Sequence, residues 1–169
     1  MNYKKCVYFV EGECENQLIN ALKIEPRLVI PGKVKVFNVI KNEIPRREVN
    51  MIQSGTIVVF VFDTDVKKTD ILLKNITYVK KYVSQVKIVL LAQVLNFEDE
   101  IARATDVKEA KEITKSRSVR NFKTDFCKLK TEECRNALNR HNIDIEVLWS
   151  KIPPDCFSFI EQNGKIIKL

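Results

Sequence analysis

Acidic residues follow two apolar runs of the chain at positions where they could hold a divalent cation. The runs are residues 4–10 and 57–62, and both are rich in β-branched residues, which favour strands. The carboxyl ends of parallel strands line one crevice of an open α/β sheet, so acids that are distant in sequence can converge there. Mg²⁺ prefers oxygen ligands of this kind. The acids are Glu11 and Glu15 after the first run, and Asp63 and Asp65 after the second.

The spacing of the first two acids favours a metal site with more than one carboxylate. Glu15 follows Glu11 by four residues, one helical turn if a helix has begun, so both could face the same crevice. Two metal ions about 4 Å apart can activate water and stabilise the leaving oxygen in phosphodiester cleavage. We therefore expect Mg²⁺ or Mn²⁺ at these four carboxylates. Gly12 permits a tight turn and close approach to a ligand.

A purely structural interpretation of the same acids stays open. Glu13 and Glu15 would then be first-turn acids that interact favourably with a helix dipole. Asp63 and Asp65 would be solvated turn formers. The metal interpretation is favoured because both acidic groups follow apolar strands in one α/β pattern.

The elements that must position these groups alternate between strand and helix patterns. Residues 57–62 are continuously apolar, as is typical of a central parallel strand covered on both faces. Right-handed crossovers would place helices on both faces of the sheet. We expect an α/β, Rossmann-like fold with a mainly parallel four-stranded sheet flanked by helices. The expected strands are 4–10, 34–39, 57–62 and 87–94, the helices 13–24 and 69–84, and a short helix or turn 46–53.

The sequence pattern of residues 106–169 predicts a helical extension. Asn163-Gly164 suits a type I′ turn and predicts a terminal β-hairpin over residues 156–169, which could form a docking edge. We divide the chain into a catalytic core, 1–105, and a helical extension with the hairpin, 106–169, packed on the same domain. The expected helices of this part are 97–104, 108–114, 119–129, 131–140 and 144–151.

Length and composition favour a globular cytoplasmic protein. The chain has 169 residues, 45% hydrophobic and 30% charged, which suits one domain. No stretch approaches the roughly 20 apolar residues that span a bilayer, and the start runs into a strand pattern rather than a signal peptide. The five cysteines form no CxxC pair, which favours reduced thiols over zinc or disulfides. The net charge of +7 suits a polyanionic partner or solubility alone.

Basic residues are concentrated between positions 115 and 130: this segment contains six basic residues and a single acidic residue, Asp125. This segment could bind the phosphates of a nucleic acid or stabilise charge on a scissile phosphate. Phe122 and Phe126 are four residues apart, and we expect them to be core anchors rather than platforms for base stacking. The alternative for the basic residues is a solvated amphipathic helix with a basic outer face. The candidate nucleic-acid contacts are Lys115, Arg117, Arg120 and Lys123.

The motifs Val10-Glu11-Gly12-Glu13-Cys14-Glu15 and Asp63-Thr64-Asp65 resemble those of the Toprim domain, particularly in overcoming-lysogenization-defect nucleases and RloB-like proteins. The resemblance covers residues 4–98 and implies a Toprim-like fold with Mg²⁺-dependent phosphodiester chemistry at Glu11, Asp63 and Asp65. In the nuclease branch it implies that Glu15 also serves the metal. Asn96-Phe97-Glu98 is similar to a further motif of RloB-like proteins and adds Glu98 to the catalytic acids. Cys14 stands where the family usually has threonine.

The resemblance implies a metal-dependent nuclease of DNA or RNA, with a role in anti-phage defence. Lys67 occupies the place of a further acid of topoisomerases, which disfavours that activity. The related nucleases carry an ATPase in the same chain; this sequence has no phosphate-binding Gly-x-x-x-x-Gly-Lys loop, so an ATPase would be a separate partner. The sequence leaves open whether the chain forms a homo-oligomer.

Two other functions remain as alternatives. One is a non-hydrolytic Toprim-like subunit that binds nucleic acid or regulates a complex with a separate ATPase. The other is a phosphoacceptor receiver domain, which would need an acidic pair after the first strand and a lysine after a fifth. The chain has Glu11-Gly12 after the first strand and no fifth strand–helix unit, so the receiver is disfavoured.

Overall fold

Four parallel strands form the centre of the molecule, which is known from a computed structural model that describes residues 5–160 and 164–169. Their order in the sheet is β2-β1-β3-β4. The α/β fold with a four-stranded parallel sheet is therefore confirmed. β3 is buried from Thr56 to Phe62, as its continuous apolar sequence predicts. The strands are β1 (Lys5–Val10), β2 (Lys33–Val36), β3 (Thr56–Asp63) and β4 (Lys87–Gln93).

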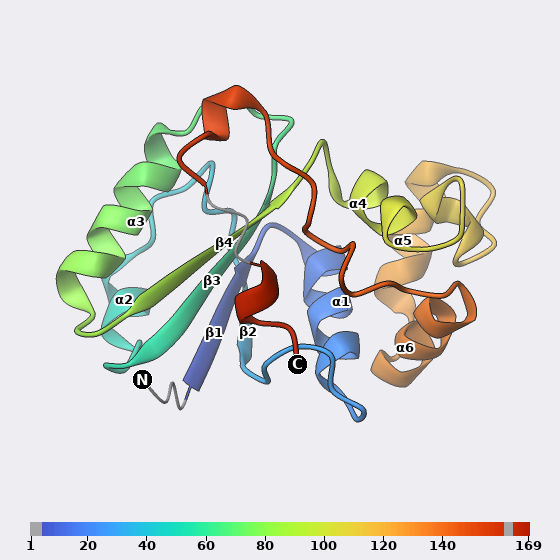
Figure 1. The fold of residues 1–169 in the computed structure, drawn as a ribbon, viewed down its shortest axis with the longest axis horizontal. Coiled ribbons are helices and arrows are strands. Elements are labelled where there is room, and N and C mark those ends of the chain that lie inside the picture. Colours follow the sequence, from blue (N-terminus) through green and yellow to red (C-terminus); the bar gives the residue numbers. More distant parts are fainter. Residues whose placement is uncertain (1–4, 161–163) are drawn as a thin grey trace.

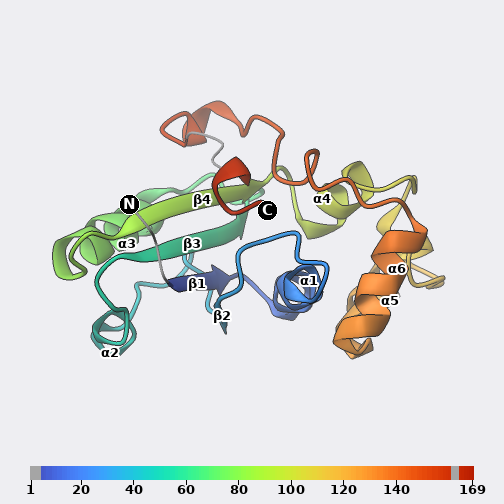
Figure 2. The same cartoon turned by 60° about the horizontal axis from the view of Figure 1, so that its bottom comes forward.

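Helices cover both faces of this sheet (Figure 1). Successive strand side chains point to opposite faces, so each strand contributes to two hydrophobic cores. Tyr8 and Val59 pack in the core that α1 (Glu13–Lys23) covers. Phe9 and Phe60 pack in the core covered by α2 (Arg46–Asn50) and α3 (Asp70–Tyr82). Figure 2 shows α3 and α1 on opposite sides of the sheet.

Three further helices lie beyond α1, as Figures 1 and 2 show. They are α4 (Phe97–Arg103), α5 (Val119–Lys128) and α6 (Thr131–Arg140). Phe97, Phe122 and Phe126 form one aromatic cluster with ring centroids 5.2–6.2 Å apart. These rings belong to the same hydrophobic core as α1 and one face of the sheet, so a single core joins the sheet and these three helices.

Two predicted helices of the second part are wrong. Of residues 108–114, only the 3₁₀ turn η1 (Ala110–Glu112) is helical. Residues 144–151 form turns, and Trp149 adopts a φ of 57°. Its backbone N–H donates to the buried carboxylate of Glu100 at 2.6 Å, and its ring is buried. A tertiary contact therefore overrides local helix propensity at this point. β2 also ends at Val36, before the predicted residue 39.

The predicted terminal hairpin is wrong as well. Its described residues form two 3₁₀ turns, η2 (Asp155–Phe157) and η3 (Gly164–Ile166), whereas residues 161–163 lie outside the described part. Phe157 stacks on Phe62 at 5.9 Å in one core, and Ile167 is buried in the other. The two described ends of this segment therefore pack in different hydrophobic cores, and they are not paired as the strands of one hairpin.

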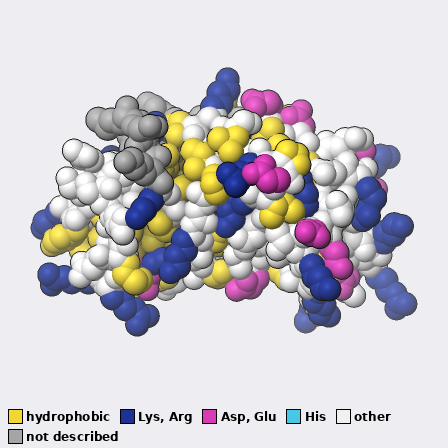
Figure 3. Space-filling view, turned by 90° about the horizontal axis from the view of Figure 1, so that it is seen from below, with side chains coloured by type: hydrophobic (Ala, Val, Ile, Leu, Met, Phe, Trp, Pro, Cys, Tyr) yellow, Lys and Arg dark blue, Asp and Glu magenta, His cyan; other side chains and the backbone are white. Residues whose placement is uncertain are grey.

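Lys and Arg side chains do not gather in one place on the face that Figure 3 shows. This face is the side at which β1 begins, and its Lys and Arg side chains are scattered among hydrophobic, acidic and other side chains. The net charge of +7 therefore makes no single basic track on this face.

In the described part of the chain, no helix has the length and apolar composition needed to cross a bilayer.

Candidate functional site

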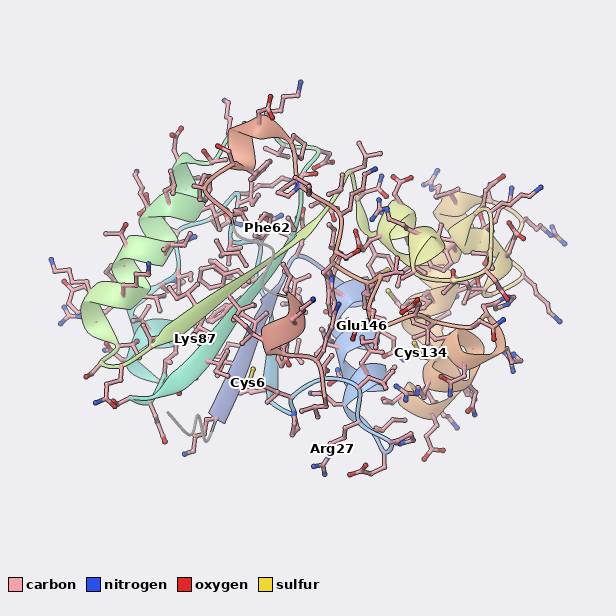
Figure 4. The ribbon with its side chains drawn as sticks, in the orientation of Figure 1. Cys6, Arg27, Phe62, Lys87, Cys134 and Glu146 are labelled. Atoms are coloured by element: carbon pink, nitrogen blue, oxygen red, sulfur yellow. The ribbon has the colours of Figure 1, made fainter. Side chains whose placement is uncertain are left out.

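The carboxyl ends of β1, β3 and β4 lie at one edge of the sheet, and the predicted acids gather there. Asp63, the last residue of β3, is in register with Gln93, the last residue of β4. Glu11 directly follows β1. Figure 4 shows the direction of the strands, with Phe62 near the carboxyl end of β3 and Lys87 at the opposite end of β4. The parallel topology thus brings together side chains separated by more than fifty residues, as predicted.

Backbone amides hold the first two glutamates of the site. One oxygen of Glu11, Oε2, accepts a hydrogen bond from the N–H of Asp63 at 3.2 Å, and its Oε1 lies 3.6 Å from Nζ of Lys41. Glu15 lies in the first turn of α1, is only 4% exposed, and accepts a hydrogen bond from the N–H of Gly12 at 3.0 Å. These bonds fix both carboxylates at the junction between β1 and α1.

Gly12 matters here because of the space that it leaves. Its φ of −149° is extended, so its backbone conformation does not require glycine. A Cβ at this position would lie 3.3 Å from Oε2 of Glu15, which is closer than ordinary van der Waals contact. A side chain at position 12 would therefore press on the Glu15 carboxylate.

Gln93 is a member of the site that the sequence analysis missed. It is completely buried at the end of β4. With its side-chain nitrogen facing the acids, the amide donates to Oδ1 of Asp63 at 2.9 Å and to Oε1 of Glu15 at 3.2 Å. The sequence does contain a signal for it: Gln93 is a polar residue at the end of an apolar strand, as Glu11 and Asp63 are at the ends of the first and third strands. We call Glu11, Glu15 and Asp63 the inner acidic group.

The inner acidic group carries more negative charge than its surroundings neutralise. Burial, and then the charges of Glu15, Glu11 and Asp65, raise the pKa of Asp63 from 3.8 to about 8, while Lys123 opposes the rise. Burial also raises the pKa of Glu15, assisted by the charge of Glu11. At neutral pH this group therefore favours either a bound proton or a nearby cation.

Glu98 and Lys123 form a second charged feature of the site, which we call the outer pair. Nζ of Lys123 on α5 lies 3.0 Å from Oε1 of Glu98 on α4. The other oxygen, Oε2, is buried without a hydrogen-bond partner among the described residues. The positive charge of Lys123 also acts on Asp63 and Glu15, so the pair lies beside the inner acidic group.

Asp65 lies at the exposed side of this edge. Its backbone N–H donates to the carbonyl of Leu95 at 3.1 Å, and the hydroxyl of Thr64 accepts from the N–H of Leu95 at 3.0 Å. These bonds join the loop after β3 to the loop after β4. The two aspartates differ in exposure: the Asp63 side chain is partly buried, and the Asp65 side chain is exposed.

Of the four predicted nucleic-acid contacts, only Lys123 is tied to the acidic edge. Lys115 instead lines a separate pocket of about 380 Å³, together with residues of α5 and α6. Arg117 and Arg120 are exposed and have no ion-pair partner within residues 5–160 and 164–169. Phe122 is buried, as is Phe126, which confirms the prediction that both anchor the helix.

The inner acidic group has the right chemistry for Mg²⁺ but not a closed set of ligands. Within the described ranges, no three or more His, Cys, Asp or Glu side chains are arranged so that they could hold a metal ion. Backbone amides occupy one oxygen each of Glu11 and Glu15, and the Gln93 amide lies between Glu15 and Asp63. A cation would have to displace some of these hydrogen bonds. The oxygen donors and their uncompensated charge fit a hard divalent cation.

Comparisons with known protein families, with curated proteins and with solved structures found no match for this chain.

Proposed function

We propose that this protein is a metal-dependent nuclease of the Toprim type that hydrolyses phosphodiester bonds of DNA or RNA. The observation that carries the proposal is the inner acidic group, in which burial and neighbouring carboxylates raise the pKa of Asp63 to about 8. A divalent cation would relieve this excess of negative charge. A bound Mg²⁺ or Mn²⁺ would supply an activated water and stabilise charge on the phosphate.

The residues of the edge have separate roles in this proposal. Asp63 and Glu11 offer carboxylate oxygens at the strand ends, and Asp65 adds one from the exposed side. Glu15 is buried, and its hydrogen bonds with Gly12 and Gln93 hold it in place as a further oxygen donor. These are the metal ligands that the motifs predict.

The outer pair would act on the nucleic acid. The side chain of Lys123 is 55% exposed, so its ammonium can reach a phosphate while it remains near the carboxylates. Glu98 orients that ammonium through its Oε1. Arg117 and Arg120 lie just before and in the first turn of the same helix and would extend phosphate binding away from the edge.

The direct test is cleavage of short end-labelled single-stranded DNA, duplex DNA and RNA with Mg²⁺ or Mn²⁺. We expect wild-type protein to cleave at least one of these substrates and Asp63→Asn to lose about 100-fold or more of the rate. Asp155→Asn, an identical change at an exposed acid of η2, should retain the wild-type rate. The proposal fails if neither metal supports cleavage and Asp63→Asn binds Mn²⁺ as tightly as wild type.

A second function, a non-hydrolytic nucleic-acid-binding subunit, is favoured by one observation. The acids of the edge form no three-residue metal group within the described residues. Such a subunit would bind nucleic acid equally well in Mg²⁺ and in a chelator, and would cleave nothing alone. Addition of a separate ATPase partner would then be needed for any activity. The resemblance is the only support for a role in anti-phage defence.

A further inference from the structure

Two cysteines from distant parts of the chain lie in direct contact beside the acidic edge. Sγ of Cys14, in the first turn of α1, lies 3.1 Å from Sγ of Cys127, in the last turn of α5. The sulfurs of a disulfide are about 2.05 Å apart, so closing the gap requires a movement of about 1 Å. Cys14 is 8% exposed, and Cys127 is more accessible.

The other three cysteines have different surroundings. Cys134 on α6 is completely buried, and Figure 4 shows it on the helical side of the molecule. Cys6 is buried near the start of β1, far from the carboxyl edge, and Cys156 is exposed in η2. All five are free thiols. Cys14 and Cys127 are therefore the pair that the fold presents for cross-linking.

The contact also reaches the helix turn that carries Lys123. Sγ of Cys14 lies 3.7 Å from the backbone oxygen of Lys123. A covalent bond between Cys14 and Cys127 would therefore fasten this part of α5 to the first turn of α1. Glu15 of the inner acidic group lies on α1, and Lys123 of the outer pair lies on α5.

We propose that Cys14 and Cys127 form an oxidation site, at which a low-molecular-weight disulfide converts the two thiols into an intramolecular disulfide. The thiolate of Cys127, the more accessible sulfur, attacks one sulfur of the reagent and releases one thiolate. The thiolate of Cys14 then attacks Sγ of Cys127 and releases the second. Two protein thiols are oxidised, one disulfide is reduced to two thiols, and the two protein protons pass to the released thiolates.

The cross-link would stabilise the fold and restrict one motion. Cys14 and Cys127 are separated by 113 residues, so the bond closes a long loop and constrains the unfolded chain. It would also prevent α5 from moving away from α1 at the acidic edge.

The test equilibrates the intact protein with mixtures of reduced and oxidised glutathione, followed by alkylation, intact mass measurement and peptide mapping. Oxidised wild type should lose two hydrogen atoms and give one peptide that joins Cys14 to Cys127, and dithiothreitol should reverse both changes. Its urea midpoint should rise. Cys127→Ser should show neither change, whereas Cys156→Ser, the matched exposed control, should behave as wild type.

Two results would overturn the proposal. One is a Cys127 that carries only a glutathione mixed disulfide while Cys14 stays alkylatable. The other is a cross-link that joins Cys127 to Cys134. Cys127→Ala and the urea midpoint of each reduced variant show whether a negative result comes from misfolding. None of these measurements depends on nuclease activity.

Discussion

The inner acidic group and the outer pair lie at the same edge of the sheet, but different physical forces hold them. Strand ends and backbone amides position Glu11, Glu15 and Asp63, whose charge is largely uncompensated. Helix packing positions Glu98 and Lys123, which neutralise each other. In the proposed nuclease, the sheet would supply the place that attracts a cation, and the helices would supply the ammonium group of Lys123 beside it.

Disruption of the aromatic cluster that packs α5, the helix that carries Lys123, should have the largest effect on stability. Phe122 on α5 is completely buried against Phe97 and Phe126. We expect Phe122→Ala to lower the free energy of unfolding by about 3–5 kcal/mol, because it leaves a cavity in the aromatic cluster. Urea denaturation measures this loss. Phe159→Ala, at a partly exposed phenylalanine, should cost much less; equal losses would contradict the assigned role of the cluster.

Protonation of Asp63 should have the second-largest effect on stability. The pKa of Asp63 rises from 3.8 to about 8 on folding, so the folded state favours its protonated form. This contribution to stability is fully present below about pH 4 and is lost as the pH rises through about 8. In Asp63→Asn the loss should disappear. About four pKa units correspond to about 6 kcal/mol, and solvent screening of this partly exposed carboxylate roughly halves that figure, so the variant should be about 2–3 kcal/mol more stable than wild type at pH 8 in a chelator.

Urea denaturation from pH 4 to pH 8.5 checks this difference, with Asp155→Asn as the control of equal charge change. At mildly alkaline pH, Mg²⁺ at 100 times its Kd should stabilise wild type by about 2.7 kcal/mol. It should have little effect on Asp63→Asn. If the free energy of unfolding varied with pH in the same way for wild type and Asp63→Asn, the pKa of Asp63 would not be raised by folding.

A smaller effect should follow from the neutralisation of one neighbour inside the group. Glu15 is the leading charged contributor to the raised pKa of Asp63. We expect Glu15→Gln to lower that pKa by about one unit, which corresponds to about 1.4 kcal/mol. Carbon NMR titration of the Asp63 carboxyl measures it. Glu13→Gln, an exposed acid of the same helical turn, should leave the titration unchanged, and similar shifts in both variants would argue against a specific contact.

The smallest effect on stability should come from the outer pair itself. Lys123 is more than half exposed, so loss of its ion pair in Lys123→Ala should cost about 0–1 kcal/mol. The same variant should raise the pKa of Asp63 further and reduce the salt dependence of nucleic-acid binding by about one charge. Fluorescence anisotropy at several salt concentrations measures the slope. An equal change in Lys128→Ala would place the phosphate contact elsewhere on α5.

The elements up to position 104 were largely predictable because they follow local patterns. Apolar runs marked the strands, and β3 is the clearest case. The helix at 131–140 was predicted with its observed ends. The residues around Trp149 could not be predicted in this way, because a hydrogen bond to Glu100 decides their conformation. The predicted terminal hairpin was wrong for a similar reason, since Phe157 and Ile167 are buried in different cores.

The sequence by itself determined the parallel α/β sheet and the delivery of Glu11, Glu15 and Asp63 to one edge. These features depend on residue type and spacing along single strands and helices. Only the tertiary structure decided that Gln93 lies between two acids, that Lys123 faces Glu98, and that the pKa of Asp63 is raised. Burial and charge compensation depend on side chains from several elements, and no local pattern contains that information.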